Sequence, residues 1–359
     1  MRATGLDAIV SCSPENYAYV TGFVSPTQGL MRWRHAMALV TRDGAVALLT
    51  VDMEESTIKS KAPGTEMAVW REFKFDAMAV LADLLQKHGL TSARIGIETD
   101  YLPAADFIVL KKTLPQAEFV PVQATLARLR QIKSPEELEI LRKLSRIADQ
   151  GIADAYAAVH AGATEMDLAG VLSRRMFELG ADHFKLMIVA TGERSVFPNV
   201  GPSHRVLKSG DVCRVEIFPT LNGYHAGVCR TAYVDTPPAE SERIWANLDA
   251  CKKMLLGAIK PGARTREIYA SYLEKIGELG LPPISFIGHG IGLHLHEDPY
   301  LGPTEDQALE PGMVLGIEPL IYETGFGFGM QNKDMVVVTA AGCELLSDCT
   351  DTTEMIRVG

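Results

Sequence analysis

Three histidines and one glutamate are the residues of this sequence best suited to chemistry. His289, His294 and His296 fall within eight residues, between glycines, and Glu318 ends a later apolar run. Histidine transfers protons near neutral pH and binds metals, and a carboxylate in an apolar strand needs a partner. The segment suggests a strand, a loop and a strand, in which His294 and His296 would share one face. A lone histidine is more often an ordinary core residue, but this cluster predicts a pocket around His289, His296 and Glu318.

Two other segments place charged residues among apolar ones. Glu216 lies on a predicted strand that turns at Asn222-Gly223, a typical hairpin dipeptide, into a second strand carrying Arg230. Lys333 lies among apolar residues in the last predicted strand. Taken singly, each charge could equally belong to a solvated strand face. Together with the histidine segment, they are candidates for the same site.

The elements that must position these residues form two domains. The first part of the chain alternates short β-rich runs with helical ones, which predicts a small α/β domain over residues 1–123. Residues 124–359 form the second domain. It begins with a basic stretch and with Ser134-Pro135-Glu136-Glu137, a capping box that predicts a long helix to about residue 160. We expect an α/β (α+β) fold.

The second domain contains a short internal repeat. Gly162-Ala163 recurs as Gly262-Ala263, and Glu-Leu-Gly at 178–180 recurs at 278–280. These short motifs are common at the ends of unrelated helices, so the matches could be coincidental. They could also mark two related α+β halves. The second interpretation predicts a pocket at the junction of the halves, where ligands tend to bind.

Composition narrows the classes of partner. The 359 residues carry a net charge of −10, which argues against nucleic-acid or anionic-membrane partners and favours a small-molecule substrate. The six cysteines are scattered, which is typical of reduced thiols. No leader-like or membrane-spanning apolar run is evident, so we expect a cytoplasmic protein.

The order of the motifs resembles the creatinase, aminopeptidase P and prolidase (M24) family along nearly the whole chain. The resemblance rests on Ser-Pro-Glu-Asn (13–16), Asn-Gly-Tyr-His (222–225), Arg-Thr (230–231), Gly-His-Gly-Ile-Gly (288–292), His-Glu-Asp-Pro (296–299), Glu-Pro-Gly-Met (310–313) and Ile-Glu-Pro (317–319). It implies a creatinase-like N-terminal domain, followed by a pita-bread catalytic domain of two pseudo-symmetric halves. It also implies a homodimer.

The resemblance bears directly on metals. Peptidases of this family hold two divalent metals with Asp, Asp, His, Glu and Glu, and these positions fall here on Glu216, Gly227, His289, Glu318 and Lys333. Gly227 offers no ligand, and the ammonium of Lys333 would repel cations. We therefore expect no metal and no other cofactor.

Three functions remain open on the sequence. The leading hypothesis is a creatinase-like hydrolase that cleaves a C–N bond in a small guanidino, amidino or amide compound without a dinuclear metal centre. Lys333 would supply positive charge between Glu216 and Glu318, His296 would be the general acid or base, and His289 or Glu318 would act on water. The first alternative is an Xaa-Pro-type metallopeptidase with an atypical single metal on Glu216, His289 and Glu318. The second is a catalytically inactive member that acts as a binding protein.

Further residues are candidates for substrate binding. Asn199 stands where the resemblance leads us to expect histidine, which weakens the likeness to creatinase. In the family, the N-terminal domain of one subunit can reach the partner's site, where cations would suit a substrate that bears a carboxylate. The candidates are Asn199, His204, His225, Arg230, His294, Arg32, Trp33 and Arg34.

Overall fold

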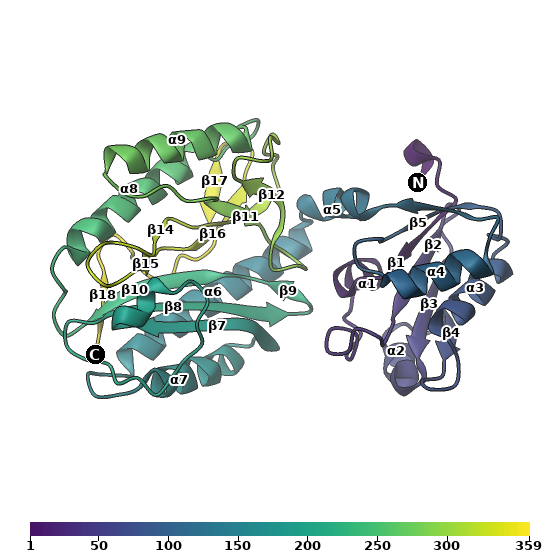
Figure 1. Cartoon of the computed structure of the whole chain (residues 1–359), viewed down its shortest axis with the longest axis horizontal. Helices are drawn as coiled ribbons and strands as arrows, with labels where there is room; N and C mark the ends of the chain where they lie inside the picture. Colours follow the sequence, from purple (N-terminus) through teal and green to yellow (C-terminus); the bar gives the residue numbers. More distant parts are fainter. The chain divides into compact units, whose positions relative to one another are not determined.

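The computed structural model describes residues 1–359, which divide into two compact units, Met1–Arg130 and Gln131–Gly359 (Figure 1). Each unit has its own sheets and its own hydrophobic core. None of the helices combines the length and the apolar character needed to span a bilayer.

The N-terminal unit is built on a mixed six-stranded sheet in the order β4-β3-β2-β1-β5-β6. Parallel pairing joins β1 to β5, β5 to β6 and β3 to β4, and the other pairs are antiparallel. The strands are β1 (Ala8–Ser11), β2 (Met37–Thr41), β3 (Val46–Val51), β4 (Glu66–Trp70), β5 (Arg94–Ile97) and β6 (Glu118–Pro121).

Helices cover both faces of this sheet because successive side chains of a strand point to opposite faces. On one face, Met37 and Leu39 pack with Leu81 of α3 and Leu110 of α4. On the other, Ala38 packs with residues of α1 and α2. The helices are α1 (Pro14–Thr21), α2 (Glu55–Lys61), α3 (Ala77–Lys87) and α4 (Ala104–Thr113), followed by α5 (Gln123–Gln131). The predicted α/β domain with flanking helices is confirmed.

The C-terminal unit contains two α+β halves. The first half is the sheet β18-β10-β8-β7, with β9 paired to β8, and it packs against α6 and α7. Its elements are α6 (Pro135–Ala157), α7 (Glu165–Glu178), β7 (His183–Thr191), β8 (Val212–Leu221), β9 (Tyr224–His225), β10 (Val228–Val234) and β18 (Ile356–Val358). The predicted capping box at Ser134 and Glu137 begins α6, and Asn222 and Gly223 form the predicted turn with positive φ.

The second half is the sheet β12-β11-β13-β16-β17, which packs against α8 and α9. Its elements are α8 (Ser241–Ala258), α9 (Thr265–Glu278), β11 (Gly288–Gly290), β12 (Glu297–Leu301), β13 (Val314–Ile317), β16 (Asp334–Val338) and β17 (Cys343–Leu345). A separate ribbon pairs β14 (Leu320–Ile321) with β15 (Met330–Gln331). Figure 1 shows the two helix pairs on the outside of this unit, with the sheets between them.

The two halves repeat the same local structure. Helices α7 and α9 each have 14 residues and are shifted by one hundred positions. The N–H of Gly162 donates to Leu207 O, and the N–H of Gly262 donates to Leu309 O, at 2.9 and 2.8 Å. Both glycines have a left-handed φ, which other residues adopt at a cost. The repeat in the sequence therefore reflects two related halves.

Candidate active site

A cavity of about 700 Å³ lies in the C-terminal unit and contains the predicted site. Its polar groups include His296, Glu216, Glu318 and Lys333. Most of its wall is apolar or aromatic: Leu186, Ile188, Pro198, Phe218, Ile284, Phe286, Leu295, Leu320 and Tyr322. Such a mixture of apolar wall and few polar groups is typical of a small-ligand site.

Backbone pairing between the two halves brings the charged residues together. Cys229 on β10 lies opposite Glu216 on β8, and a separate bridge pairs Cys229 with Lys333. The two backbone hydrogen bonds of this bridge are both 3.2 Å long. Glu216 of the first sheet and Lys333, which directly precedes β16, therefore become neighbours across one strand.

The ammonium of Lys333 is the centre of the site. Its Nζ lies 2.9 Å from Oε1 of Glu318, 3.2 Å from Oε1 of Glu216 and 3.3 Å from Nε2 of His289. All four side chains are at most 6% exposed. The ammonium thus occupies the space between the two carboxylates.

Lys333 and the neighbouring carboxylates keep one another ionised although they are buried. Burial opposes the charge of Lys333, but Glu318 and Glu216 raise its pKa above the usual value. Burial likewise opposes ionisation of Glu318, yet Lys333 and His289 hold its pKa well below the usual range. Both groups are charged at neutral pH.

His289 and His296 form a stacked pair. Their ring centroids are 3.6 Å apart, with an angle of 11° between the planes. Nδ1 of His289 lies 2.7 Å from Gly290 O and Nε2 lies 2.8 Å from Oε1 of Glu318, so both ring nitrogens face oxygen acceptors. Burial, with His289 and Lys333, lowers the pKa of His296 to about 4, which keeps its ring neutral near pH 7. The neutral ring of His296 is therefore suited to accept a proton or bind a cation.

The donor set fits one divalent cation. Ligand atoms of His289, His296 and Glu318 all lie within 4.8 Å of one another. Oε1 of Glu318 is buried, 2.8 Å from His289 Nε2 and 2.9 Å from Lys333 Nζ. Three protein ligands suffice for a catalytic metal. The other predicted set is Glu216, His289 and Glu318; the ammonium of Lys333 contacts all three of these residues, two of which also belong to the first group.

The remaining predicted residues of the C-terminal unit lie at varied distances from this cavity. Asn199 lines it. His225 is partly buried and its N–H donates to Gly292 O at 2.7 Å. His204 and His294 are exposed and do not belong to the cavity wall. The expectation that His294 and His296 share a strand face is wrong, because both lie in the loop between β11 and β12.

The structure does not bring Arg230 to the cavity. Its guanidinium is completely buried and pairs with Asp149 at 2.9 Å and Asp334 at 2.7 Å. Lys252 adds a second cation at 2.7 Å from Asp334. Arg230 also donates to Lys333 O at 2.8 Å, so this closed cluster holds the backbone of the cavity lysine.

Arg32, Trp33 and Arg34 lie in the N-terminal unit, between α1 and β2. Arg34 pairs with Glu72 at 2.9 Å, and the indole N–H of Trp33 donates to the same carboxylate at 3.1 Å. Arg32 is exposed. Trp33 is exposed as well, whereas Arg34 is partly buried.

The sequence analysis missed the apolar and aromatic wall of the cavity and one polar neighbour of Glu318. Phe218 and Tyr322 line the cavity. Gln331 donates to Glu318 at 3.3 Å and accepts from Arg214 at 3.2 Å. Phe218 lies two residues after Glu216, and Gln331 lies two residues before Lys333. Since residues two apart share a strand face, this spacing could have predicted that both belong to the site.

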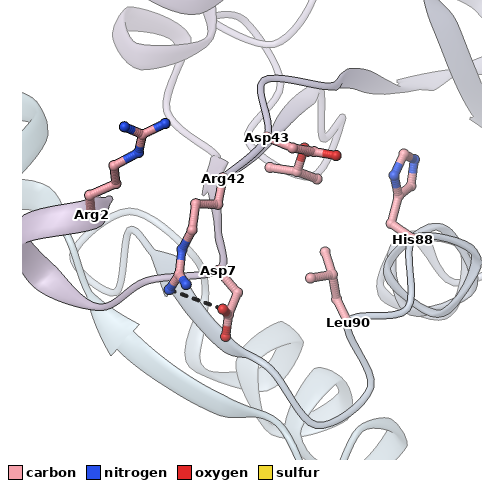
Figure 2. A pocket seen from close by; sticks show the side chains of 7 residues that line it. Arg2, Asp7, Arg42, Asp43, His88 and Leu90 are labelled. Carbon is pink, nitrogen blue, oxygen red and sulfur yellow. Dashed lines mark hydrogen bonds and ion pairs between the residues drawn. The ribbon is translucent and has the colours of Figure 1, made fainter.

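A smaller, open cavity of about 420 Å³ lies in the N-terminal unit (Figure 2). It is lined by Arg2, Asp7, Thr41, Arg42, Asp43, His88 and Leu90. Arg42 pairs with Asp7 at 3.0 Å, and His88 pairs with Glu66 at 3.1 Å. Because these charges satisfy one another, the cavity of the C-terminal unit is the better candidate.

Comparisons with known proteins agree with this choice. Residues 139–340 match the model of metallopeptidase family M24, and residues 1–132 match the creatinase/prolidase N-terminal domain. "Probable dipeptidase PepE" of Mycobacterium bovis is 32% identical over 73% of this chain and 72% of its own. "Xaa-Pro dipeptidase" of Pyrococcus furiosus is 32% identical over 61% of this chain and 64% of its own. The solved Xaa-Pro dipeptidase from Bacillus anthracis is 26% identical, with a TM-score of 0.86 over 99% of this chain and 96% of its own.

These findings confirm the predicted family, the pita-bread architecture and the hydrolysis of a C–N bond, since a peptide bond is one. They overturn the metal-free creatinase-like hydrolase and the expectation of no cofactor, because the matching family is one of metallopeptidases. The expectation of no metal had been based on Gly227 and Lys333. They argue against two metals, but they leave the ligand group His289, His296 and Glu318 in place.

Proposed function

Because the chain belongs to metallopeptidase family M24, we propose that it is a peptidase of the Xaa-Pro dipeptidase type that cleaves short peptides with one divalent cation. The observation that carries the proposal is the meeting of His289, His296 and Glu318, of which His296 and Glu318 line the cavity of the catalytic domain. Relatives named as dipeptidases and Xaa-Pro dipeptidases support the class of substrate.

The donor set defines how the cation would be held. His289 Nε2, His296 and Glu318 would be its ligands, and Gly290 O orients the His289 ring through Nδ1. When bound, the cation supplies a Lewis acid for the peptide carbonyl or an activated water. The chain itself keeps Glu318 ionised through Lys333 and limits the access of bulk water.

The cavity wall suits the rest of the substrate. Phe286 stands with its centroid 6.1 Å from that of His296, in an edge-on arrangement, and Tyr322 and Phe218 extend the aromatic surface. Binding of an apolar ring, such as that of proline, against this wall is favourable because it removes the ring from water. We therefore expect apolar residues on both sides of the cleaved bond, with small, rigid residues preferred.

The test is peptidase activity of the purified chain after removal of metals. Ala-Pro, Gly-Pro and Ala-Leu would be offered with Mn²⁺, Co²⁺ or Zn²⁺ added singly, and free amino acids would be measured. We expect cleavage that requires an added cation and is abolished in Glu318→Gln. Glu344→Gln, which alters an exposed ion pair with Arg142, is the matched control and retains activity. Absence of cleavage with every peptide and cation would overturn the proposal.

Two further features stay predictions that accompany this proposal. The first is a homodimer, in which Arg32 of one protomer would serve the carboxylate of a peptide bound to the partner. Sedimentation equilibrium would test the dimer directly. The second is a cytoplasmic location, which fractionation of the source cells would test.

A further inference from the structure

We infer that Phe218 and Lys333 together fill the place of a second metal, so that this cavity takes one divalent cation. The inference concerns the second cation only; it deepens the proposed function, which supplies the first. It rests on contacts of three residues of this chain: Phe218, Gly227 and Lys333.

The first step is the position of the ammonium. Lys333 Nζ is within 3.3 Å of ligand atoms from Glu216, Glu318 and His289. These are the distances of hydrogen-bonded ion pairs, and they place a fixed cation where the carboxylates would otherwise bridge a metal. The side chain is 1% exposed and is held on β-structure by the pairing of Lys333 with Cys229. The position of the ammonium is therefore fixed by the folded backbone.

The second step is the packing of Phe218 against Gly227. A Cβ added at Gly227 would lie 2.3 Å from one ring carbon of Phe218 and 2.8 Å from another. The ring thus occupies the volume that any side chain at position 227 would need. The same ring faces Lys333, whose Nζ is 4.5 Å from its centroid, a cation–π distance. Phe218 excludes a ligand at 227 and also contacts the ammonium.

The third step is charge. Glu216 and Glu318 contribute two negative charges, and Lys333 contributes one positive charge. These three side chains together carry one net negative charge. One divalent cation leaves a modest positive excess, whereas two would leave a large one in a buried cavity, which is strongly unfavourable.

Metal content tests this inference without any assay of activity. The wild-type chain would be titrated with Mn²⁺, and bound metal would be measured by calorimetry and elemental analysis. The triple variant Phe218→Gly, Gly227→Asp, Lys333→Glu would be compared with the double variant Gly227→Asp, Lys333→Glu, which keeps the ring. We expect at most one Mn²⁺ per wild-type chain, one more in the triple variant, and no gain in the double variant.

The outcomes separate the inference from the proposed function. Two tightly bound Mn²⁺ per wild-type chain would overturn the inference, and this measurement needs no variant to fold. A gain in the double variant equal to that in the triple would show that Phe218 does not exclude the second metal. Failure of the proposed function would instead appear as missing peptidase activity in the wild type, whatever its metal content.

Discussion

Lys333 and Asp334 are adjacent in sequence, yet they belong to two buried charge clusters of opposite character. Lys333 joins Glu216 and Glu318 beside the cavity. Asp334 joins Arg230, Asp149 and Lys252 in the interior. The first cluster carries a net negative charge and opens onto the cavity, whereas the second contains two cations and two anions. The comparison teaches that charge balance and access, more than burial, distinguish a site from a structural network.

The closed cluster also supports the open one. Arg230 donates to the carbonyl of Lys333, and the hydroxyl of Ser347 donates to Asp334 at 2.7 Å. Asp149 accepts backbone N–H groups from Cys349 and Thr350, at 2.8 and 3.1 Å. These bonds hold the strand segment from which Lys333 projects. Disruption of the closed cluster should therefore act on stability first.

The largest expected effect is on folding, from Arg230→Met. The variant leaves the carboxylates of Asp149 and Asp334 buried with less compensation, which typically costs about 3–5 kcal/mol. Urea unfolding would measure the free energy. The matched control is Arg146→Met, which removes an exposed pair with Asp348 and should cost less than about 1 kcal/mol. Equal losses in the two variants would break the distinction between a buried network and a surface pair.

The next effect is on activity, from His296→Ala. Loss of a proton-transferring or ligand imidazole typically lowers the rate about 100-fold or more. We expect this loss in kcat/KM for a dipeptide, together with weaker Mn²⁺ binding and little change in urea unfolding. His160→Ala, which changes an exposed histidine, is the control. If His296→Ala destabilised the fold as much as Arg230→Met, the open cluster would also be structural.

A pH effect should arise from a buried group whose charge has no strong compensation. Burial lowers the pKa of His225 to about 4; Lys185 and His294 lower it further, while Gly292 O and Glu297 oppose the shift. Because the unfolded chain binds this proton near pH 6.5, stability is complete above that pH and falls as the pH drops toward 4. We expect a loss of roughly 2 kcal/mol between pH 6.5 and 5.

His225→Gln provides the comparison for this pH effect. It removes the titrating group, so the unfolding free energy should fall less over the same range in urea titrations. Identical pH profiles for the variant and the wild type would show that His225 is not the group responsible.

The smallest effect is expected from the exposed Arg32. If its charge serves a substrate carboxylate in a dimer, Arg32→Ala should raise KM for Ala-Pro about fivefold and leave kcat unchanged, as for loss of one exposed ion pair. Arg71→Ala, also exposed in the N-terminal unit, is the control. An unchanged KM would remove Arg32 from the site and leave the cavity cluster as the only charged contact tested.

The sequence by itself determined the local structure. Capping residues at Ser134, the turn at Asn222-Gly223 and the recurring glycines at 162 and 262 act through nearby backbone, so their effects could be predicted. The ordered motifs likewise identified the family and led to His289, His296 and Glu318. These features depend on residues a few positions apart, or on motifs written directly in the chain.

Only the tertiary structure decided which buried charges do chemistry. Arg230 and Lys333 look alike in sequence, but the pairing of Cys229 with both Glu216 and Lys333 brings one to the cavity. The packing of the Phe218 ring against the backbone of Gly227 likewise depends on how the chain folds after β8. The bridge between Cys229 and Lys333 joins residues about a hundred positions apart, and charge balance depends on all the neighbours at once. The sequence pointed to Gly227 and Lys333, and the fold added the contacts of Phe218 on which our inference of a single cation also rests.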